Sequence, residues 1–263
     1  MFAALFVACD DGTGRVDRST LSQQALMELF IFGLNEPEKI CGTRDGPDDV
    51  CKWRGVKCNA DGEVERFLWS NKKKDGNGTL GFEFLPRSIQ AVHMSGNSLN
   101  GTIQLADLPG RMEVVSLTNN KLTGSLDLDT LPATFRGLQL CVNQFTGEIS
   151  LENLPKCLEF LSLAVNQLSG TICLTSLPPV LETLDLGQNR FEGSLDFRRI
   201  PESVRTMQLN ENRFSGTIDL GNLPESMVLD VRQNTLSGTV RVPQHGLIVV
   251  LEGNDELTVE RIE

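Results

Sequence analysis

The stretch Leu181-Glu-Thr-Leu-Asp-Leu-Gly-Gln-Asn189-Arg-Phe-Glu-Gly193 is one copy of a phrase that occurs seven times in this chain of 263 residues. A Leu-Pro or Ile-Pro pair separates successive copies. The repeat asparagines lie 23 residues apart, with a last interval of 22: Asn97, Asn120, Asn143, Asn166, Asn189, Asn212 and Asn234. Such a period is typical of a short structural unit stacked on itself. The sequence therefore predicts one elongated solenoid rather than a globule with a single central core.

Each part of the repeat predicts a local structure. Leu184 and Leu186 flank Asp185, as in a strand whose two leucines point inward. We expect the repeat asparagine to be buried, with its amide bonded to backbone groups that a tight bend leaves without partners. The glycine four residues later marks a second bend. The Leu-Pro pairs end any strand and suit a short 3-10 or extended return on the convex side.

A different kind of sequence precedes the repeats. Thr20 and Gln23 form a predicted capping box, and apolar residues at helical spacing follow as far as Gly33, which predicts a short helix. Trp53 is expected to cover the open end of the solenoid. The predicted organisation is a leader and linker (1–18), an N-terminal capping region (19–61), one degenerate and seven clear repeats (62–245), and a degenerate repeat or C-terminal cap (246–263).

The charge and hydropathy of the chain argue against some classes of partner. The net charge of −11 and the pI near 4.8 argue against a nucleic-acid partner, which needs clustered Lys and Arg. Lys72-Lys73-Lys74 is expected to be a solvated loop. No run of about 18 apolar residues is present, so no membrane span is predicted. The apolar start, Met1 to Cys9, resembles a short signal peptide.

The repeat pattern over residues 62–254 is identified as that of leucine-rich repeat proteins. Leu168-Ser-Gly-Thr-Ile172 and Phe214-Ser-Gly-Thr-Ile218 resemble the plant-type subclass. Cys51-Lys-Trp-Arg-Gly-Val-Lys-Cys58 looks like the N-terminal cap of plant receptor ectodomains and polygalacturonase inhibitors. The Leu-Pro returns depart from the plant pattern and are closer in style to leucine-rich repeat proteins of protists, including kinetoplastid surface-antigen-like ones.

The resemblance implies a β-rich α/β fold. This is a right-handed leucine-rich repeat solenoid with a curved, parallel concave sheet, short convex returns and a small helical cap at the N-terminus. It also implies recognition of a protein, peptide or glycan along the concave sheet. No cofactor is predicted. The N-terminal cap of this family contains a disulfide, which here would join Cys51 and Cys58. Cys141, Cys157 and Cys173 are interpreted as free thiols, with a Cys141–Cys157 bridge as the alternative.

Strand alternation predicts which side chains reach the concave face. They stand two, four and six residues before each repeat asparagine. Val114 and Phe160 give this face an uncharged centre that could anchor a partner; the alternative is that Phe160 only packs on its neighbours. The candidate binding residues are Val114, Ser116, Gln139, Phe160, Ser162, Asp185, Gln208, Asp230 and Arg232.

The same face carries residues that could serve in catalysis or metal binding. His93 and Ser116 would be neighbours in one column, but the nearest carboxylate of that column, Asp185, lies four strands away, about 19 Å. A hydrolytic triad requires hydrogen-bond contact, so no enzyme is predicted. Asp185 and Asp230 are expected about 10 Å apart as solvated carboxylates, with a Ca²⁺ or cationic-ligand site as the alternative.

The predicted function is recognition of a macromolecule by a secreted or cell-surface protein. Two alternatives stay open: an inhibitor of cell-wall-degrading glycosidases, and a cytoplasmic repeat scaffold. Asn77 and Asn100 each begin an Asn-Gly-Thr triplet and are candidate glycosylation acceptors if the chain is secreted. The sequence does not predict an oligomeric state.

Overall fold

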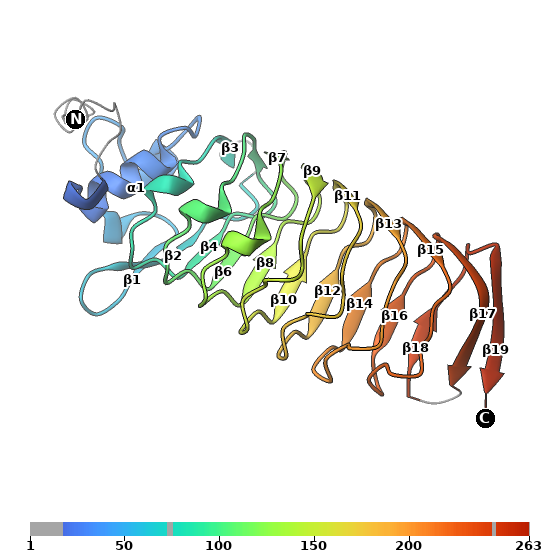
Figure 1. Cartoon of the computed structure of the whole chain (residues 1–263). Coiled ribbons are helices and arrows are strands. Elements are labelled where there is room, and N and C mark those ends of the chain that lie inside the picture. The colour runs from blue at the N-terminus through green and yellow to red at the C-terminus, as the bar shows by residue number, and fades with distance from the viewer. Residues whose placement is uncertain (1–17, 73–75, 244–245, 263) are drawn as a thin grey trace, which may run out of the picture.

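The computed structural model describes residues 18–72, 76–243 and 246–262. Figure 1 shows an elongated stack of turns, with the helical N-terminal region at one end and the C-terminal strands at the other. The predicted leader falls outside the described residues apart from Arg18, as do Lys73 and Lys74 of the lysine-rich loop. Lys72 is exposed, and its Nζ atom lies 4.7 Å from the centre of the Trp69 ring.

A ten-stranded sheet runs the length of the stack. Its first two strands are antiparallel and all later neighbours are parallel, each residue standing opposite its equivalent in the next repeat. The inward leucines of the repeats, such as Leu161 and Leu184, are fully buried. This architecture confirms the predicted repeat solenoid. The strands are β1 (Val56–Cys58), β2 (Val64–Leu68), β4 (Ala91–His93), β6 (Val114–Ser116), β8 (Gly137–Gln139), β10 (Phe160–Ser162), β12 (Thr183–Asp185), β14 (Thr206–Gln208), β16 (Val228–Asp230) and β18 (Ile248–Val250).

A second, seven-stranded sheet follows the repeat asparagines, and the sequence did not predict it. Gly193, with φ at 87°, ends one of its strands in a conformation that favours glycine. Phe191 and Phe214 stack inside it with ring centres 6.3 Å apart. The strands are β7 (Thr123–Gly124), β9 (Gln144–Glu148), β11 (Gln167–Gly170), β13 (Arg190–Gly193), β15 (Arg213–Gly216), β17 (Thr235–Pro243) and β19 (Glu256–Ile262), while β3 (Asn77–Gly78) and β5 (Ser98–Leu99) form a separate pair.

The returns that lead back to the ten-stranded sheet are short, as the Leu-Pro pairs predict. The first three contain 3-10 turns, η5 (Phe82–Phe84), η6 (Leu105–Asp107) and η7 (Leu128–Thr130). The later returns consist of turns and extended backbone. Within the described residues, no helix combines the length and apolar character needed to cross a lipid bilayer.

The repeat asparagines form a hydrogen-bonded ladder through the interior. The Asn143 Nδ2 atom donates to the carbonyl oxygens of Leu117 and Leu140, both at 3.0 Å. Its Oδ1 atom accepts from the amide of Leu122 at 3.0 Å. One side chain thus satisfies three backbone groups from its own turn and the preceding one, which confirms the predicted role. The ladder continues to Asn254, which bonds Val231, Leu236 and Leu251 in the same way.

The residue before each ladder asparagine takes a left-handed backbone conformation. Glycine or asparagine fills this position in several repeats, but Val142 and Val165 occupy it with φ at 56°. A branched side chain is rare there, and the strain is about 1–3 kcal/mol for each residue. Both valines are also exposed, at 41% and 39%. The sequence pattern did not predict this conformation.

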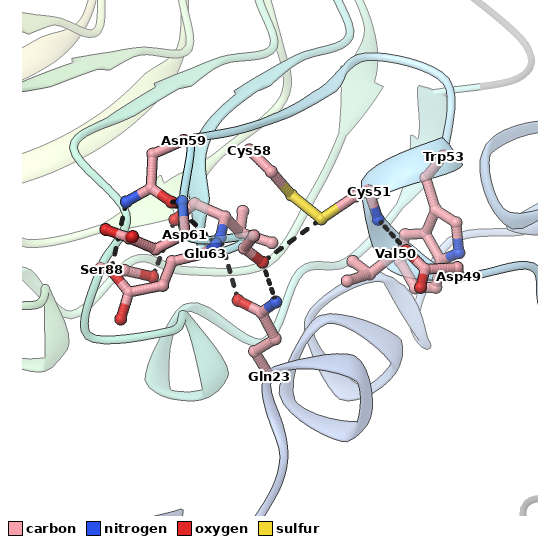
Figure 2. Close-up of a disulfide and its surroundings, with 12 residues drawn as sticks. Gln23, Asp49, Val50, Cys51, Trp53, Cys58, Asn59, Asp61, Glu63 and Ser88 are labelled. Atoms are coloured by element: carbon pink, nitrogen blue, oxygen red, sulfur yellow. Dashed lines mark hydrogen bonds between the residues drawn. A yellow bond between two sulfur atoms is a disulfide. The ribbon is translucent and has the colours of Figure 1, made fainter.

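The N-terminal cap contains η2 (Arg18–Thr20), α1 (Gln23–Ile31), α2 (Glu38–Cys41) and η3 (Val50–Lys52). The predicted capping box is wrong: Ser22 caps α1, and its hydroxyl accepts from the amide of Ala25 at 3.2 Å. Gln23 bonds the first repeat instead, because its amide donates to the Gly62 carbonyl and accepts from the Val64 amide (Figure 2). The glutamine therefore fastens the helix to the solenoid.

Aromatic residues complete the contact between cap and solenoid. Phe30 is fully buried and meets Phe67 and Phe82 edge to face, with ring centres 5.7 and 5.8 Å away. Trp53 is buried in the same hydrophobic core, and its indole nitrogen donates to the Asp48 carbonyl at 2.8 Å. These rings cover the first turn of the stack, where the repeat leucines would otherwise meet water.

A disulfide joins Cys51 and Cys58, as the resemblance implies (Figure 2). It ties η3 to β1 in front of the first repeat. Cys41, Cys141, Cys157 and Cys173 are free thiols. The alternative bridge between Cys141 and Cys157 is therefore not formed.

Candidate ligand-binding face

The ten-stranded sheet presents three outward columns of side chains, set by strand alternation. In the middle repeats these side chains carry no charge over strands β6, β8 and β10. We name this area the central patch, made of Val114, Gly137, Gln139, Cys141, Phe160 and Ser162. The register places Val114, Gly137 and Phe160 side by side, and Ser162 next to Gln139.

The centre of the patch is hollowed because a glycine stands between two apolar side chains. A Cβ atom built on Gly137 would lie 3.8 Å from the Val114 methyls and 4.0 Å from the Phe160 ring. Phe160 is 38% exposed, although it is among the largest apolar side chains of the chain. Gly137 itself is buried between them, so the hollow is a shallow dip with apolar walls, and the exposed Phe160 ring is the apolar surface that a partner could contact.

A chain of hydroxyl and amide groups borders the hollow. The Ser116 hydroxyl donates to Gln139 Oε1 at 2.9 Å and lies 2.9 Å from the Ser95 hydroxyl. Ser116 is only 6% exposed. Its expected role on the face is thus reduced to holding Gln139, whose side chain is exposed.

The structure gives no support to a hydrolytic arrangement at His93. The hydroxyl of its neighbour Ser116 is engaged with Ser95 and Gln139. The register keeps Asp185 four strands away from His93. Burial lowers the pKa of His93, with the Arg66 charge as a smaller cause. A catalytic triad needs all three groups in contact, and these residues are not.

Cys141 lies half-buried in the patch. Burial raises the pKa of this thiol to about 11, and the nearby Asp185 charge contributes. A thiol of this kind stays protonated and is a poor nucleophile. Cys141 therefore belongs to the packing of the patch rather than to any chemistry.

The two carboxylates of the face have different surroundings. Asp230 forms an ion pair with Arg232, at 3.4 Å, and accepts a hydrogen bond from the Arg232 amide. Within the part of the chain that the structure describes, Asp185 accepts a single hydrogen bond, from the Gly187 amide at 3.3 Å, and burial raises its pKa. Gln208 stands between them in the register. Among the described residues no group of three His, Cys, Asp or Glu side chains is placed to hold a metal ion.

Two further features adjoin the central patch, and sequence reasoning missed both. Val142 and Val165 lie at its far border, where the strands end. The sequence held one sign of the left-handed conformation of these valines. Gly or Asn, which favour that conformation, stand before the repeat asparagine in some other repeats. Arg136 and Glu159 form an ion pair at the opposite border. The ion pair supplies a polar edge to the apolar centre, as is usual at binding interfaces, whereas the two valines extend the apolar surface on the other side.

The two candidate glycosylation acceptors differ in exposure. Asn100 is exposed, as is Thr102 of its triplet. Asn77 is half-buried in β3, where its carbonyl oxygen accepts from the Asn35 amide. Attachment of a bulky glycan needs a surface asparagine, so Asn100 is the more accessible of the two.

No protein-family model and no curated protein matches this sequence. Solved structures with similar folds include the leucine-rich repeat ectodomain of the Arabidopsis thaliana receptor kinase GASSHO1/SCHENGEN3 in complex with CASPARIAN STRIP INTEGRITY FACTOR 2. It is 22% identical with a TM-score of 0.65, over 91% of this chain and 29% of the ectodomain chain.

Two other structures give the same result. A plant ice-binding protein is 20% identical with a TM-score of 0.55, over 85% of this chain and 89% of its own. The Arabidopsis receptor kinase HAESA, in complex with the peptide hormone IDA and the co-receptor SERK1, is 23% identical with a TM-score of 0.50, over 82% of this chain and 40% of its own. At these identities the likenesses establish the fold alone: the chain is a leucine-rich repeat solenoid.

Proposed function

We propose that this protein is a non-enzymatic recognition protein that binds an extended polypeptide segment on its ten-stranded sheet, through the central patch. The exposed Phe160 ring carries the proposal, together with the partly exposed Val114 on the other side of the shallow hollow over Gly137. Burying such an aromatic ring against a partner is a common source of binding energy. The HAESA structure, with its peptide hormone, is an example of a peptide complex in this fold.

A polypeptide fits the hollow better than a glycan does. A sugar ring would place hydroxyl groups against the methyls of Val114, where they lose hydration without a hydrogen-bond partner. An aliphatic or aromatic side chain meets no such penalty. The amide nitrogen of the exposed Gln139, beside the hollow, is available to donate to the backbone of an extended segment, since Ser116 engages only the Oε1 atom.

The Phe160→Ala variant tests the proposal. Peptides are selected with the wild-type protein from a random linear library displayed on phage, and their affinities are measured by calorimetry. We expect the variant to bind them about 30-fold more weakly, which corresponds to a hot-spot loss of about 2 kcal/mol. Gly137→Val should weaken binding as well, because its side chain fills the hollow while its Cβ atom meets only ordinary contacts.

Phe32→Ala is the matched control, because Phe32 is an exposed phenylalanine in the cap, away from the patch. Equal affinity of the Phe160→Ala and wild-type proteins would remove the central patch as the binding site. Phe160-dependent binding on a glycan array, with no peptide retained, would assign the patch to a glycan instead.

We propose further that the chain works at the cell surface or after secretion. The Cys51–Cys58 disulfide supports this, because such bonds persist in oxidising compartments. On expression through a secretory pathway we expect Asn100 to carry a glycan and Asn77 to remain unmodified. Peptide mass spectrometry before and after enzymatic removal of N-glycans shows which of the two asparagines carries a glycan. An unmodified Asn100 together with two reduced cap cysteines would favour the cytoplasmic alternative.

A further inference from the structure

Asp185 stands out among the charged groups of the ten-stranded sheet. It lies on β12, next to Ser162 of the central patch in the register. Its carboxylate is half-buried, yet among the described residues no Lys or Arg forms an ion pair with it. Because burial without a counter-charge raises its pKa, the ionised carboxylate makes the native state less stable at neutral pH.

Asp185 lies within the reach of a short peptide that is bound at the hollow. Gly137 lies two strands and two residues away, about 12 Å by strand spacing and rise. In an extended segment, alternate residues point to the same side and stand about 7 Å apart. A long basic side chain spans the remaining distance. One short segment can therefore reach both the hollow and the carboxylate.

We infer that the segment bound at the central patch carries a lysine or arginine two residues from its apolar anchor, and that this basic group pairs with Asp185. The inference rests on the proposed function and adds the charge of the ligand to it. Charge complementarity supports it, because the isolated carboxylate would gain its first cationic partner on binding.

A metal ion is a poorer occupant of this position. Ca²⁺ takes six to eight oxygen ligands, whereas the neighbours of Asp185 in its column are Ser162 and Gln208. Asp230 is already paired with Arg232. The surroundings of Asp185 therefore suit a single cationic side chain.

The phage-displayed linear library and the Asp185→Asn variant test the inference. We expect peptides retained by the wild-type protein to be enriched in Lys or Arg at the second position from an apolar residue. Asp185→Asn should bind them about tenfold more weakly, the loss typical of one charge-assisted hydrogen bond. Replacing the basic residue of a selected peptide by norleucine should have the same effect on the wild-type protein and little effect on the variant.

The control is Asp219→Asn, which removes the same charge from an exposed return where Asp219 accepts from the Gly221 amide. It should bind like the wild type. Asp185→Asn should also be at least as stable as the wild type, so unfolding cannot explain its weaker binding. If affinity depends on Phe160 but Asp185→Asn binds normally, the inference is overturned and the proposed function stands. If no peptide is retained, or Phe160→Ala binds normally, both fail.

Discussion

Replacing Asn143 by alanine is expected to lower the free energy of unfolding by about 4 kcal/mol. The side chain satisfies the carbonyls of Leu117 and Leu140 and the amide of Leu122, all in the interior. Each buried backbone group left without a partner costs about 1–3 kcal/mol. Water cannot replace the lost bonds easily, because the inward leucines of the adjacent turns exclude it. Denaturant unfolding followed by circular dichroism measures the change.

Two further variants test whether the lost hydrogen bonds cause the destabilisation. Asn153→Ala removes an exposed asparagine whose amide donates to the exposed Asp129 carboxylate, and its effect should stay within about 0.5 kcal/mol. Asn143→Asp keeps an acceptor for the Leu122 amide but loses the bonds that Nδ2 donates to the carbonyls of Leu117, Leu140 and Cys141, and it buries a charge. It should therefore be at least as damaging as alanine. Similar stabilities for Asn143→Ala and Asn153→Ala would mean that the ladder does not hold the turns together.

Replacing Phe30 by alanine is expected to destabilise the protein by about 3–5 kcal/mol, the usual range for a buried phenylalanine. The ring is fully buried and touches Phe67 of β2 and Phe82 of η5. Its loss separates α1 from the first turn of the solenoid. Because each turn of a solenoid is stabilised by its neighbours, the damage should begin at that end.

Hydrogen exchange shows where the stability is lost. Amides of β2 and β4 should exchange much faster in Phe30→Ala, while those of β12 and β14 keep more of their protection. Phe32→Ala, one residue beyond α1, is the control because that side chain is half exposed. A uniform loss of protection from β2 to β18 would show that the solenoid unfolds as one unit and that the cap does not act locally.

The repeat itself made most of the fold predictable. Leu184, Asn189 and Gly193 recur with one spacing, so a strand, a buried amide and a bend could be assigned to each turn from local pattern alone. The second sheet was missed because its strands are short and mostly polar outside, as in Arg190–Gly193. The capping box failed for a related reason: Gln23 bonds the backbone of residues 62 and 64, a contact that local spacing does not reveal.

The candidate face was predicted less completely. Val114, Phe160 and Asp185 were placed on it by alternation, and the register agrees. Ser116 was expected among the binding residues, but its hydroxyl donates to Gln139 and the residue is buried. Val142 and Val165 were overlooked, since the left-handed conformation at their position becomes visible only in the folded backbone.

The sequence alone determined the stacking of turns, because a periodic pattern dictates the same local structure at every repeat and each turn only needs to match its neighbour. Tertiary structure decided what that stack offers to a partner. Gly137 becomes a hollow only when Val114 and Phe160 stand on either side of it. Asp185 and Asp230 share a column and a residue type, yet burial and ion pairing make one an isolated carboxylate and the other a neutralised one. Those differences arise from desolvation and distance, which depend on the arrangement of several turns in space.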